Sequence, residues 1–252
     1  MQVLFGDAVV CEAVRADRTA FEDVSVYAAD PWHPSADATI ERFYLKPLEP
    51  VSGCTDRAAC NFDGSASVDD ESCVRAETGF DCAGDELVLL DGATYLIPSE
   101  RPLQLAQGGV HAVVDMPIDY EVAFTIVPGP ETRDGWASIV HLTATGGNCC
   151  DYGDRIPAVW FHPGTRRLHV RDGHGSDGNA GCDPEEELPA GALTALRVEL
   201  RQLFVEVWLN DVLKCTEARA DRRTFENVVV YASDPWHDAA LATVDNFFMQ
   251  ST

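Results

Sequence analysis

The chain has 252 residues, 46% of them hydrophobic, which is enough for one large β-sandwich or for two domains. Asp and Glu number 42 against 18 Lys and Arg, a net charge of −24, and so acidic a surface repels the phosphates of nucleic acid. No apolar run approaches the roughly 18 residues that a transmembrane helix needs. The sequence therefore predicts neither nucleic-acid binding nor membrane insertion.

The two ends of the chain carry the same sequence twice. Residues 2–45 align with residues 206–249 without a gap at an offset of 204, and 21 of the 44 aligned positions are identical. Such a repeat indicates a duplicated domain. Because the second copy ends a long β-rich region and the first has nothing before it, we expect residues 1–46 to be the C-terminal strands of a preceding repeat in a tandem array.

Both copies contain Asp-Pro-Trp-His, at residues 30–33 and 234–237, which we interpret as a turn rather than a ligand-binding signature. Proline fixes φ and has no N–H, so Pro235 ends a strand and starts a turn. The preceding Asp234 can accept the amide hydrogens of that turn. Trp236 is expected to close the edge of the domain.

Residues 47–86 are predicted to form an acidic, cysteine-rich linker, too poor in apolar residues to hold itself without disulfides or a metal. Its sequences GCTD, ACNFD, ASVDDESC and GFDC resemble a calcium-and-disulfide repeat of secreted and surface proteins of marine bacteria and algae, which is loosely similar to thrombospondin type 3 repeats. Glu71 stands where that repeat usually has Gly. The resemblance implies Ca²⁺ held by oxygen ligands from five residues: Asp56, Asn61, Asp63, Asp69 and Asp70.

A physical argument supports the calcium prediction, since closely spaced carboxylates in a disulfide-closed loop repel one another unless a cation lies among them. The alternative is an acidic loop with no specific metal. The four cysteines of the linker could pair as Cys54–Cys73 and Cys60–Cys82, but four cysteines allow three connectivities and the sequence does not choose.

Residues 87–252 are predicted to be a complete all-β domain. Strand patterns are separated by Gly, Pro and Asp, and helical periodicity is absent. The predicted strands are 87–90, 93–97, 110–116, 120–128, 136–144, 157–163, 166–172, 194–202, 204–210, 227–233 and 242–250. About eleven strands without a helix predict an antiparallel sandwich of two sheets.

The late part of this domain has a familiar pattern. LRVEL, a short turn and VEVWLNDVL resemble the late hairpin of concanavalin A-like lectin/glucanase and laminin-G-like jelly rolls. The resemblance covers residues 87–250 and, through the repeat, residues 2–45. It implies a jelly roll and says more about fold than about function.

Catalysis is not predicted. Glucanases of the resembled fold carry E-x-D-x-x-E on one strand, and that motif does not occur here. Ser138 and His141 share a predicted strand, but no nucleophile-elbow sequence surrounds the serine. A sugar-binding site would use aromatic faces and a few fixed polar groups. The candidates, each more simply explained by packing, are Trp136, Tyr152, Trp160, His162 and Trp208.

Two acidic, cysteine-bearing loops of the domain offer further oxygen ligands. They are Asp172, Asp177, Asn179 and Asp183 in one loop and, more weakly, Asp151 and Asp154 in the other. A disulfide from Cys149 or Cys150 to Cys182 would bring the loops together, and converging oxygen ligands in flexible loops suit Ca²⁺. The alternative, a solvated acidic loop closed by a disulfide, has equal support.

Nine cysteines without zinc-type spacing indicate disulfides and an oxidising compartment. Eight are predicted to be paired, four in the linker and four in the domain: Cys54, Cys60, Cys73, Cys82, Cys149, Cys150, Cys182 and Cys215. Cys11 is expected to pair with a residue of the preceding repeat, or to be a buried free thiol. The N-terminus lacks the pattern of a secretory signal, so a signal would lie upstream.

Together these features predict a non-enzymatic extracellular protein with a structural or adhesive role, built as a tandem array on a cell surface, an appendage such as an algal flagellar hair, or a matrix. Its expected partners are other copies of the same or a related chain. The alternative function is a lectin-like module that binds polysaccharide.

Overall fold

The computed structural model describes residues 2–5, 8–12, 32–34, 37, 50–98, 102–219, 221 and 223–252. The chain divides into two compact units, residues 1–48 and 49–252. Among the described residues, every regular element is a strand. This part of the chain has no helix that is long and apolar enough to cross a membrane.

The described residues of the first unit include an antiparallel hairpin, β1 (Gln2–Phe5) and β2 (Ala8–Glu12). Val3 pairs with Cys11 and the register shifts after Val3. Val207 and Cys215, at the equivalent positions of the second copy, pair in the same way and are followed by the same shift. The duplicated sequence therefore forms the same hairpin twice, bulge included. The remaining predictions for residues 13–46 lie almost wholly outside the described residues.

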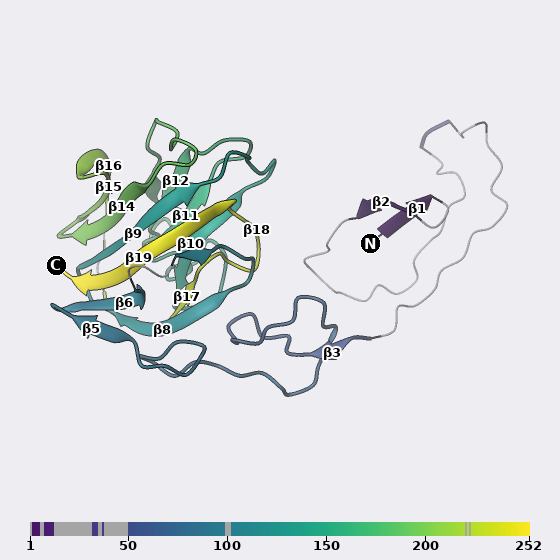
Figure 1. Ribbon diagram of the computed structural model, residues 1–252, viewed down its shortest axis with the longest axis horizontal. Coiled ribbons are helices and arrows are strands. Elements are labelled where there is room, and N and C mark those ends of the chain that lie inside the picture. Colours follow the sequence, from purple (N-terminus) through teal and green to yellow (C-terminus); the bar gives the residue numbers. More distant parts are fainter. Residues whose placement is uncertain are drawn as a thin grey trace. The chain divides into compact units, whose positions relative to one another are not determined.

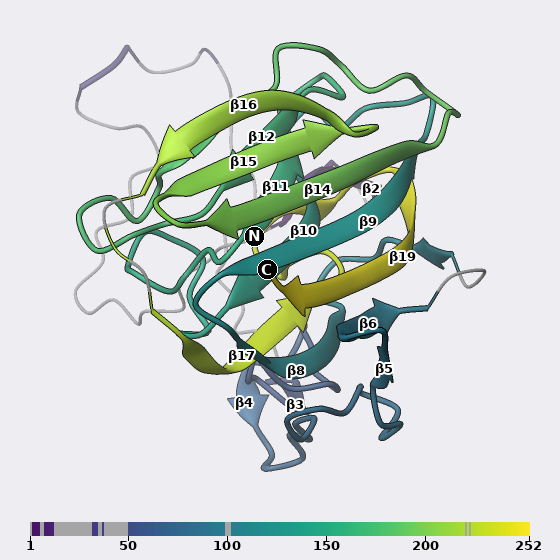
Figure 2. The same cartoon turned by 90° about the vertical axis from the view of Figure 1, so that its left-hand side faces the viewer.

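The second unit contains a sandwich of two sheets, as predicted (Figures 1 and 2). Figure 2 faces the eight-stranded sheet, whose order is β16 (Val212–Ala218), β15 (Phe204–Leu209), β14 (Thr194–Arg201), β9 (Tyr120–Pro128), β19 (Ala242–Ser251), β6 (Ala93–Ile97) and β5 (Val88–Leu90), with β7 (Leu103–Gln104) beside β19. The seven-stranded sheet behind it is β13 (Gly181–Cys182), β12 (Leu168–Arg171), β11 (Ala158–Phe161), β10 (Ala137–Thr143), β17 (Phe225–Tyr231) and β8 (Val110–Met116), with β18 (Asp238–Ala239) beside β10.

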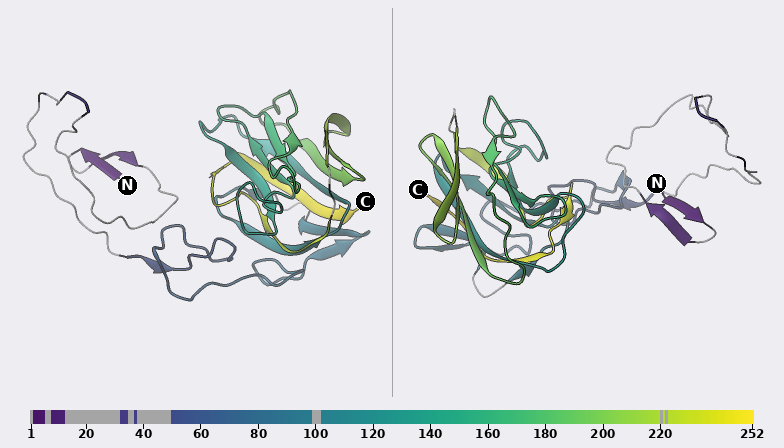
Figure 3. Two further views of the ribbon diagram at one scale, coloured as in Figure 1. Left: turned by 180° about the vertical axis from the view of Figure 1, so that it is seen from behind. Right: turned by 90° about the horizontal axis from the view of Figure 1, so that it is seen from above.

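The core follows from alternation along the strands. On β14, Leu196, Val198 and Leu200 are buried in the core between the sheets. On β9, Val122, Phe124 and Ile126 do the same from the neighbouring strand. The C-terminal strand β19 crosses the middle of this sheet (Figure 3), so the last residues of the chain help to form the core.

The cysteine-rich segment, residues 50–86, is packed against the sandwich rather than forming a separate linker. The segment is hydrogen-bonded to the backbone of edge strand β8. The N–H of Gly79 donates to Val113 O (2.8 Å), and the N–H of Cys82 donates to His111 O (3.2 Å). Residues that pair with an edge strand protect it from pairing with other chains. The segment contains only one short parallel pair, β3 (Ser52–Gly53) with β4 (Val68–Asp69).

The same segment also contacts the turn that both copies share. The Arg57 guanidinium donates to Pro235 O (3.1 Å), and the hydroxyl of the buried Tyr231 donates to Arg57 O (2.8 Å). The structure therefore joins residues 50–86 and the sandwich into one unit, where the sequence alone suggested a boundary at residue 86.

Four disulfides are present among the described residues. Two close the cysteine-rich segment, Cys54–Cys73 and Cys60–Cys82. In the sandwich, Cys149 pairs with its neighbour Cys150, and Cys182 pairs with Cys215. Cys182 therefore does not join the two acidic loops as expected. It lies opposite Val170 and faces the core, so it bonds β13 at the edge of one sheet to β16 at the edge of the other.

Candidate functional site

The outer face of the seven-stranded sheet, turned away from the core, carries a row of polar and aromatic side chains. Strand pairing places Ser138 opposite Trp160 and Trp160 opposite His169. Val159, Phe161, Leu168 and Val170, which alternate with them, belong to the core. Trp160 and Phe161 thus point to opposite faces, as alternation requires. Phe161 is buried in the core, and Trp160 is buried on the outer face because loop residues such as Arg155 cover it.

Asp234 is the centre of the polar network under these loops. Its carboxylate is fully buried and accepts hydrogen bonds from the N–H groups of Trp236 and His237 (both 2.9 Å) and from the Trp160 indole (2.8 Å). Burial would raise the pKa of Asp234, but hydrogen bonds with His141 and His237 outweigh it and hold the pKa well below its usual range. The expected Asx-type turn is confirmed.

Trp236 is only partly buried and packs on the rings of His141 (5.3 Å between centroids) and Tyr231 (5.7 Å). It therefore covers β10 and β17 on the outer face of the sheet, and not the edge of the domain where it was expected. Trp32, the equivalent residue of the first copy, is 74% exposed.

Ser138, His141 and Asp234 lie together, but their hydrogen bonds are not those of a catalytic triad. His141 Nδ1 faces Asp234 (3.3 Å), while its Nε2 donates to Asp154 O (2.7 Å) and not to the serine. The serine hydroxyl accepts the N–H of Asp234 (2.9 Å), and all three side chains are fully buried. A base aimed at a carbonyl, in a site closed to solvent, cannot activate a serine.

Beside this network, a hollow of about 270 Å³ opens to solvent, and we call it the aromatic hollow. It is lined by Trp136, Cys149, Arg155, Trp160, His169, Asn179 and His237. Trp136 is 38% exposed, whereas Trp160 is buried beneath the guanidinium of Arg155 (4.7 Å from ring to Cζ). Exposed aromatic surface with a few fixed polar groups is the composition of a small-molecule site.

A His–His–Asp cluster, His162, His169 and Asp183, adjoins the aromatic hollow. One oxygen of Asp183 lies 3.1 Å from His162 Nε2 and 3.1 Å from His169 Nδ1, and Arg171 donates to the other oxygen (2.7 Å). Burial would raise the pKa of Asp183, but hydrogen bonds with His169 and Arg171 hold it well below its usual range. Burial also lowers the pKa of His169.

The sheet register explains the cluster. Val170 pairs with Cys182, so the next residues outward, His169 and Asp183, lie opposite each other. His162 reaches the same face from the start of the β11–β12 turn, where its N–H donates to Arg167 O (2.9 Å). Trp136 packs against both imidazoles, at 4.8 Å from His162 and 4.5 Å from His169.

The predicted calcium ligands of the two acidic loops do not converge. Asp172 is buried beside Arg219 (2.6 Å) and accepts the hydroxyl of Tyr120. Asp154 is buried and accepts the N–H of Asp151 (2.8 Å). Asp177 caps the N–H of Asn179 (2.8 Å), and Asn179 accepts from Arg155. The side chains of Asp154, Asp172, Asp177 and Asn179 each have a separate protein partner, Asp183 faces two histidines and Asp151 is exposed, so these ligands are not gathered in one oxygen cage.

The predicted ligands of the cysteine-rich segment fall into two groups. Asp56 is bound by Arg75 (2.5 Å), and Asn61 bonds the backbone of Ser72 and Val74. Both are therefore occupied by protein groups. The other three each accept the backbone N–H two residues later with Oδ1. Asp69 and Asp70 are exposed, and Asp63 is partly buried.

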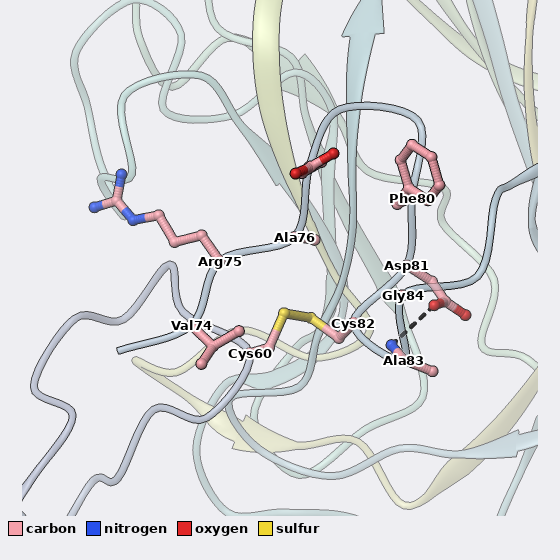
Figure 4. Close-up of a pocket in the computed structure, with 10 residues that line it drawn as sticks. Cys60, Val74, Arg75, Ala76, Phe80, Asp81, Cys82, Ala83 and Gly84 are labelled. Atoms are coloured by element: carbon pink, nitrogen blue, oxygen red, sulfur yellow. Dashed lines mark hydrogen bonds between the residues drawn. A yellow bond between two sulfur atoms is a disulfide. The ribbon is translucent and has the colours of Figure 1, made fainter. Parts of the chain in front are cut away.

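The cysteine-rich segment also has a hollow of about 430 Å³ around the Cys60–Cys82 disulfide (Figure 4). Its lining includes Arg75, Phe80 and Asp81. Asp81 caps the N–H of Ala83 (2.8 Å), as Figure 4 shows, and Arg75 binds Asp56. Since these polar groups are used within the segment, we assign no ligand to this hollow.

The other predicted aromatic candidates do not join the aromatic hollow. Trp208 lies on β15 of the opposite sheet under Arg197 (4.5 Å), and Tyr152 packs on Phe225 (5.4 Å). The sequence did not point to Arg155 or His169, and His237 was noted only as part of the Asp-Pro-Trp-His turn. His169 could have been found from alternation in RRLHVRD, which places it on the same face as Trp160 once the hairpin register is known.

Fold and site together define a disulfide-bonded, all-β sandwich with a loop-covered polar face and an aromatic hollow. No family model matches the chain, and no curated protein matched it in a similarity search. Similar solved structures include the carbohydrate-binding module CBM66 from Bacillus subtilis, with a TM-score of 0.36 and 11% identity over 64% of this chain and 84% of that chain.

Another is the binding domain of botulinum neurotoxin serotype D, with a TM-score of 0.42 and 12% identity over 67% of this chain and 42% of that chain. A third is the LG1-3 region of the laminin α2 chain, with a TM-score of 0.42 and 14% identity over 67% of this chain and 28% of that chain. The chain thus spans less than half the length of these two. Similarity at this level bears on neither ligand nor activity.

Proposed function

We propose that the chain is a non-enzymatic extracellular module with a structural or adhesive role, one unit of a tandem array. The observation that carries the proposal is the fastening of the cysteine-rich segment to the Asp-Pro-Trp-His turn through Arg57, Tyr231 and Pro235. Such a joint makes spacer and sandwich one rigid unit, and the motif of that joint occurs in both copies. Four disulfides in the described residues suit an oxidising compartment.

The location can be tested directly. Antibodies raised against residues 87–252 are expected to label the outer surface of intact, unpermeabilised cells of the organism that makes the protein, or its extracellular matrix. Labelling confined to permeabilised cells would overturn the proposal, and an antibody against a cytosolic protein serves as the control.

Ca²⁺ is retained in the proposal as a stiffener of the spacer, with Asp63, Asp69 and Asp70 as the residues that would hold it. Hydrogen bonds from Ser65 lower the pKa of Asp63, and those from Ser72 lower that of Asp70, so both carboxylates are charged at neutral pH. The Asp63 charge also acts on Asp70. Neighbouring charges of this kind favour a bound cation.

Chelation of Ca²⁺ is therefore expected to increase protease cutting between Asp63 and Asp70 and to lower the melting temperature of the chain. The matched control is Asp69→Asn/Asp70→Asn, which should already be cut in the presence of Ca²⁺. Equal cutting of the natural chain with and without chelator would remove Ca²⁺ from the proposal but leave the disulfide-held spacer intact.

A second candidate function, polysaccharide binding, is favoured by one observation: the solvent-facing Trp136 on the wall of the aromatic hollow. Sugars present C–H faces that stack on indole rings, while Arg155 and Asn179 would fix hydroxyl groups. This site could serve an adhesive module as its contact with a matrix.

Trp136→Ala is expected to weaken binding of any polysaccharide retained by the natural chain at least about 10-fold, since truncating an aromatic anchor costs roughly 2 kcal/mol. Affinity electrophoresis or a glycan array would measure it. Trp208→Ala, on the opposite sheet, is the control and should bind normally. Absence of glycan binding by the natural chain, or equal loss in both variants, would eliminate this second function.

A further inference from the structure

We propose that His162, His169 and Asp183 form a binding site for a divalent transition-metal ion such as Zn²⁺. The potential ligand atoms of these three side chains all lie within 4.8 Å of one another. Among the residues that the structure describes, no other group of three or more His, Cys, Asp or Glu residues meets this criterion. This site differs from the calcium sites predicted from the sequence. Asp183 is the one residue that it shares with them.

The spacing of the ligand atoms fits a metal. Bonds of about 2.0–2.2 Å to nitrogen and oxygen place tetrahedral ligands about 3.3–3.6 Å apart. Asp183 Oδ2 lies 3.1 Å from His162 Nε2 and 3.1 Å from His169 Nδ1, and all three ligand atoms lie within 4.8 Å of one another. An ion would thus replace the shared hydrogen bonds without moving the strands that carry these residues.

The chemistry of the donors selects the class of ion. Two imidazoles and one carboxylate suit Zn²⁺, Cu²⁺ or Ni²⁺, whereas Ca²⁺ takes six to eight oxygens. Three protein ligands leave at least one coordination position for water or another ligand.

The surroundings hold the three ligands in place and leave them accessible. Arg171 donates to Asp183 Oδ1 (2.7 Å), which also lies 3.1 Å from His169 Nδ1, and so fixes the carboxylate beside the histidines. Outer-shell partners of metal sites orient the ligands in this way. Side-chain exposure is 25% for His162 and 13% for His169. His169 also lines the aromatic hollow, so a ligand in the hollow would lie beside the ion.

Zn²⁺ titration of the full, chelator-stripped chain by calorimetry tests the proposal, with excess Ca²⁺ present to fill oxygen sites. The natural chain is expected to bind one equivalent. His162→Gln and His169→Gln should each weaken binding at least about 10-fold, because even loss of an outer-shell partner weakens metal affinity roughly 10–100-fold. His111→Gln, a partly buried histidine on β8, is the matched control and should bind as the natural chain does.

Trp136 provides a second measurement, because its ring packs on both imidazoles. Cu²⁺, which quenches nearby indoles, should quench part of the fluorescence of the natural chain but not of His169→Gln. Trp136→Phe should show less quenching, with Trp160 (5.8 Å from His169) as the remaining nearby indole, and should keep its Zn²⁺ affinity. Zn²⁺ binding is therefore measured separately from any sugar binding at Trp136. Melting curves without metal check that each variant folds, and Asp183→Asn replaces any that does not.

No saturable Zn²⁺ binding by the natural chain, or equal affinity in the natural chain and His162→Gln, would overturn the site. In that case the cluster is a carboxylate hydrogen-bonded by two histidines and an arginine, with a purely structural role.

Discussion

Replacing Asp234 with Ala is expected to lower the free energy of unfolding by about 3–5 kcal/mol, as removal of one partner from a buried charged network does. The side chain is fully buried. Its loss would leave the backbone N–H groups of Trp236 and His237 without acceptors and the Trp160 indole N–H with only His237 Nδ1 (3.3 Å), and each orphaned buried donor costs about 1–3 kcal/mol.

The effect should depend on pH with a definite sign. The folded-state pKa of Asp234 lies below its unfolded value. A carboxyl of this kind contributes stability that is fully present above the unfolded pKa, about 3.9, and is lost as pH falls from there toward the folded pKa. The difference between natural chain and variant should be constant near neutral pH and shrink below about pH 4.

Urea unfolding followed by tryptophan fluorescence measures the change. Asp238→Ala is the matched control, since Asp238 lies in the same turn region but is exposed, and an exposed substitution typically changes stability by less than about 0.5 kcal/mol. If Asp234→Ala were no more destabilising than Asp238→Ala, the turn would not depend on the buried carboxylate.

Much of the sandwich was predictable because long strands carry a readable alternation. Tyr120–Pro128 is a strand with the predicted bounds, and Val198 and Leu200 face the core as expected. The short strands Gly181–Cys182 and Asp238–Ala239 were not predicted, because two residues carry no periodicity. Without the first of these, the direction of Cys182 and hence its partner was out of reach.

The candidate site was less predictable because it depends on register between strands. His162, a predicted sugar candidate, and Asp183, a predicted calcium ligand, meet only because β11, β12 and β13 pair as they do. The covering of the outer face also escaped prediction. A fully buried Asp234 on the far side of a sheet from the core is a product of loops whose course the sequence does not specify.

The structure gives a structural role to residues that are identical in the two copies of the duplicated sequence. Asp221, which has an identical counterpart in the first copy, accepts the N–H of Gly175 (3.0 Å) with its carboxylate and so holds the glycine-rich loop. Arg219, also identical in the first copy, neutralises Asp172 at the start of that loop. These repeated residues therefore support a loop, and no ligand is needed to account for them.

Replacing Arg219 with Leu is expected to destabilise the chain by about 3–5 kcal/mol at neutral pH, because it leaves a carboxylate buried without its counter-ion. Arg219 is 2% exposed and Asp172 1% exposed, and Arg219 Nη1 lies 2.6 Å from Asp172 Oδ1. Arg223→Leu is the control. Both guanidinium groups lie over the Tyr152 ring, Arg219 at 5.8 Å and the exposed Arg223 at 3.9 Å, and loss of Arg223 should cost about 1 kcal/mol or less.

Two further results would separate an unpaired charge from simple loss of packing. Burial raises the pKa of Asp172 while Arg219 lowers it, so the variant should have a still higher pKa at Asp172. A raised carboxyl pKa gives stability that is full below the unfolded pKa, about 3.9, and is lost as pH rises through the folded pKa. The deficit of Arg219→Leu should therefore be smaller at pH 5 than at pH 7.

The double variant Arg219→Leu/Asp172→Leu removes both charges and should be more stable than Arg219→Leu alone. A double variant as unstable as the sum of the two single changes would show that the pair contributes through packing and not through its charges.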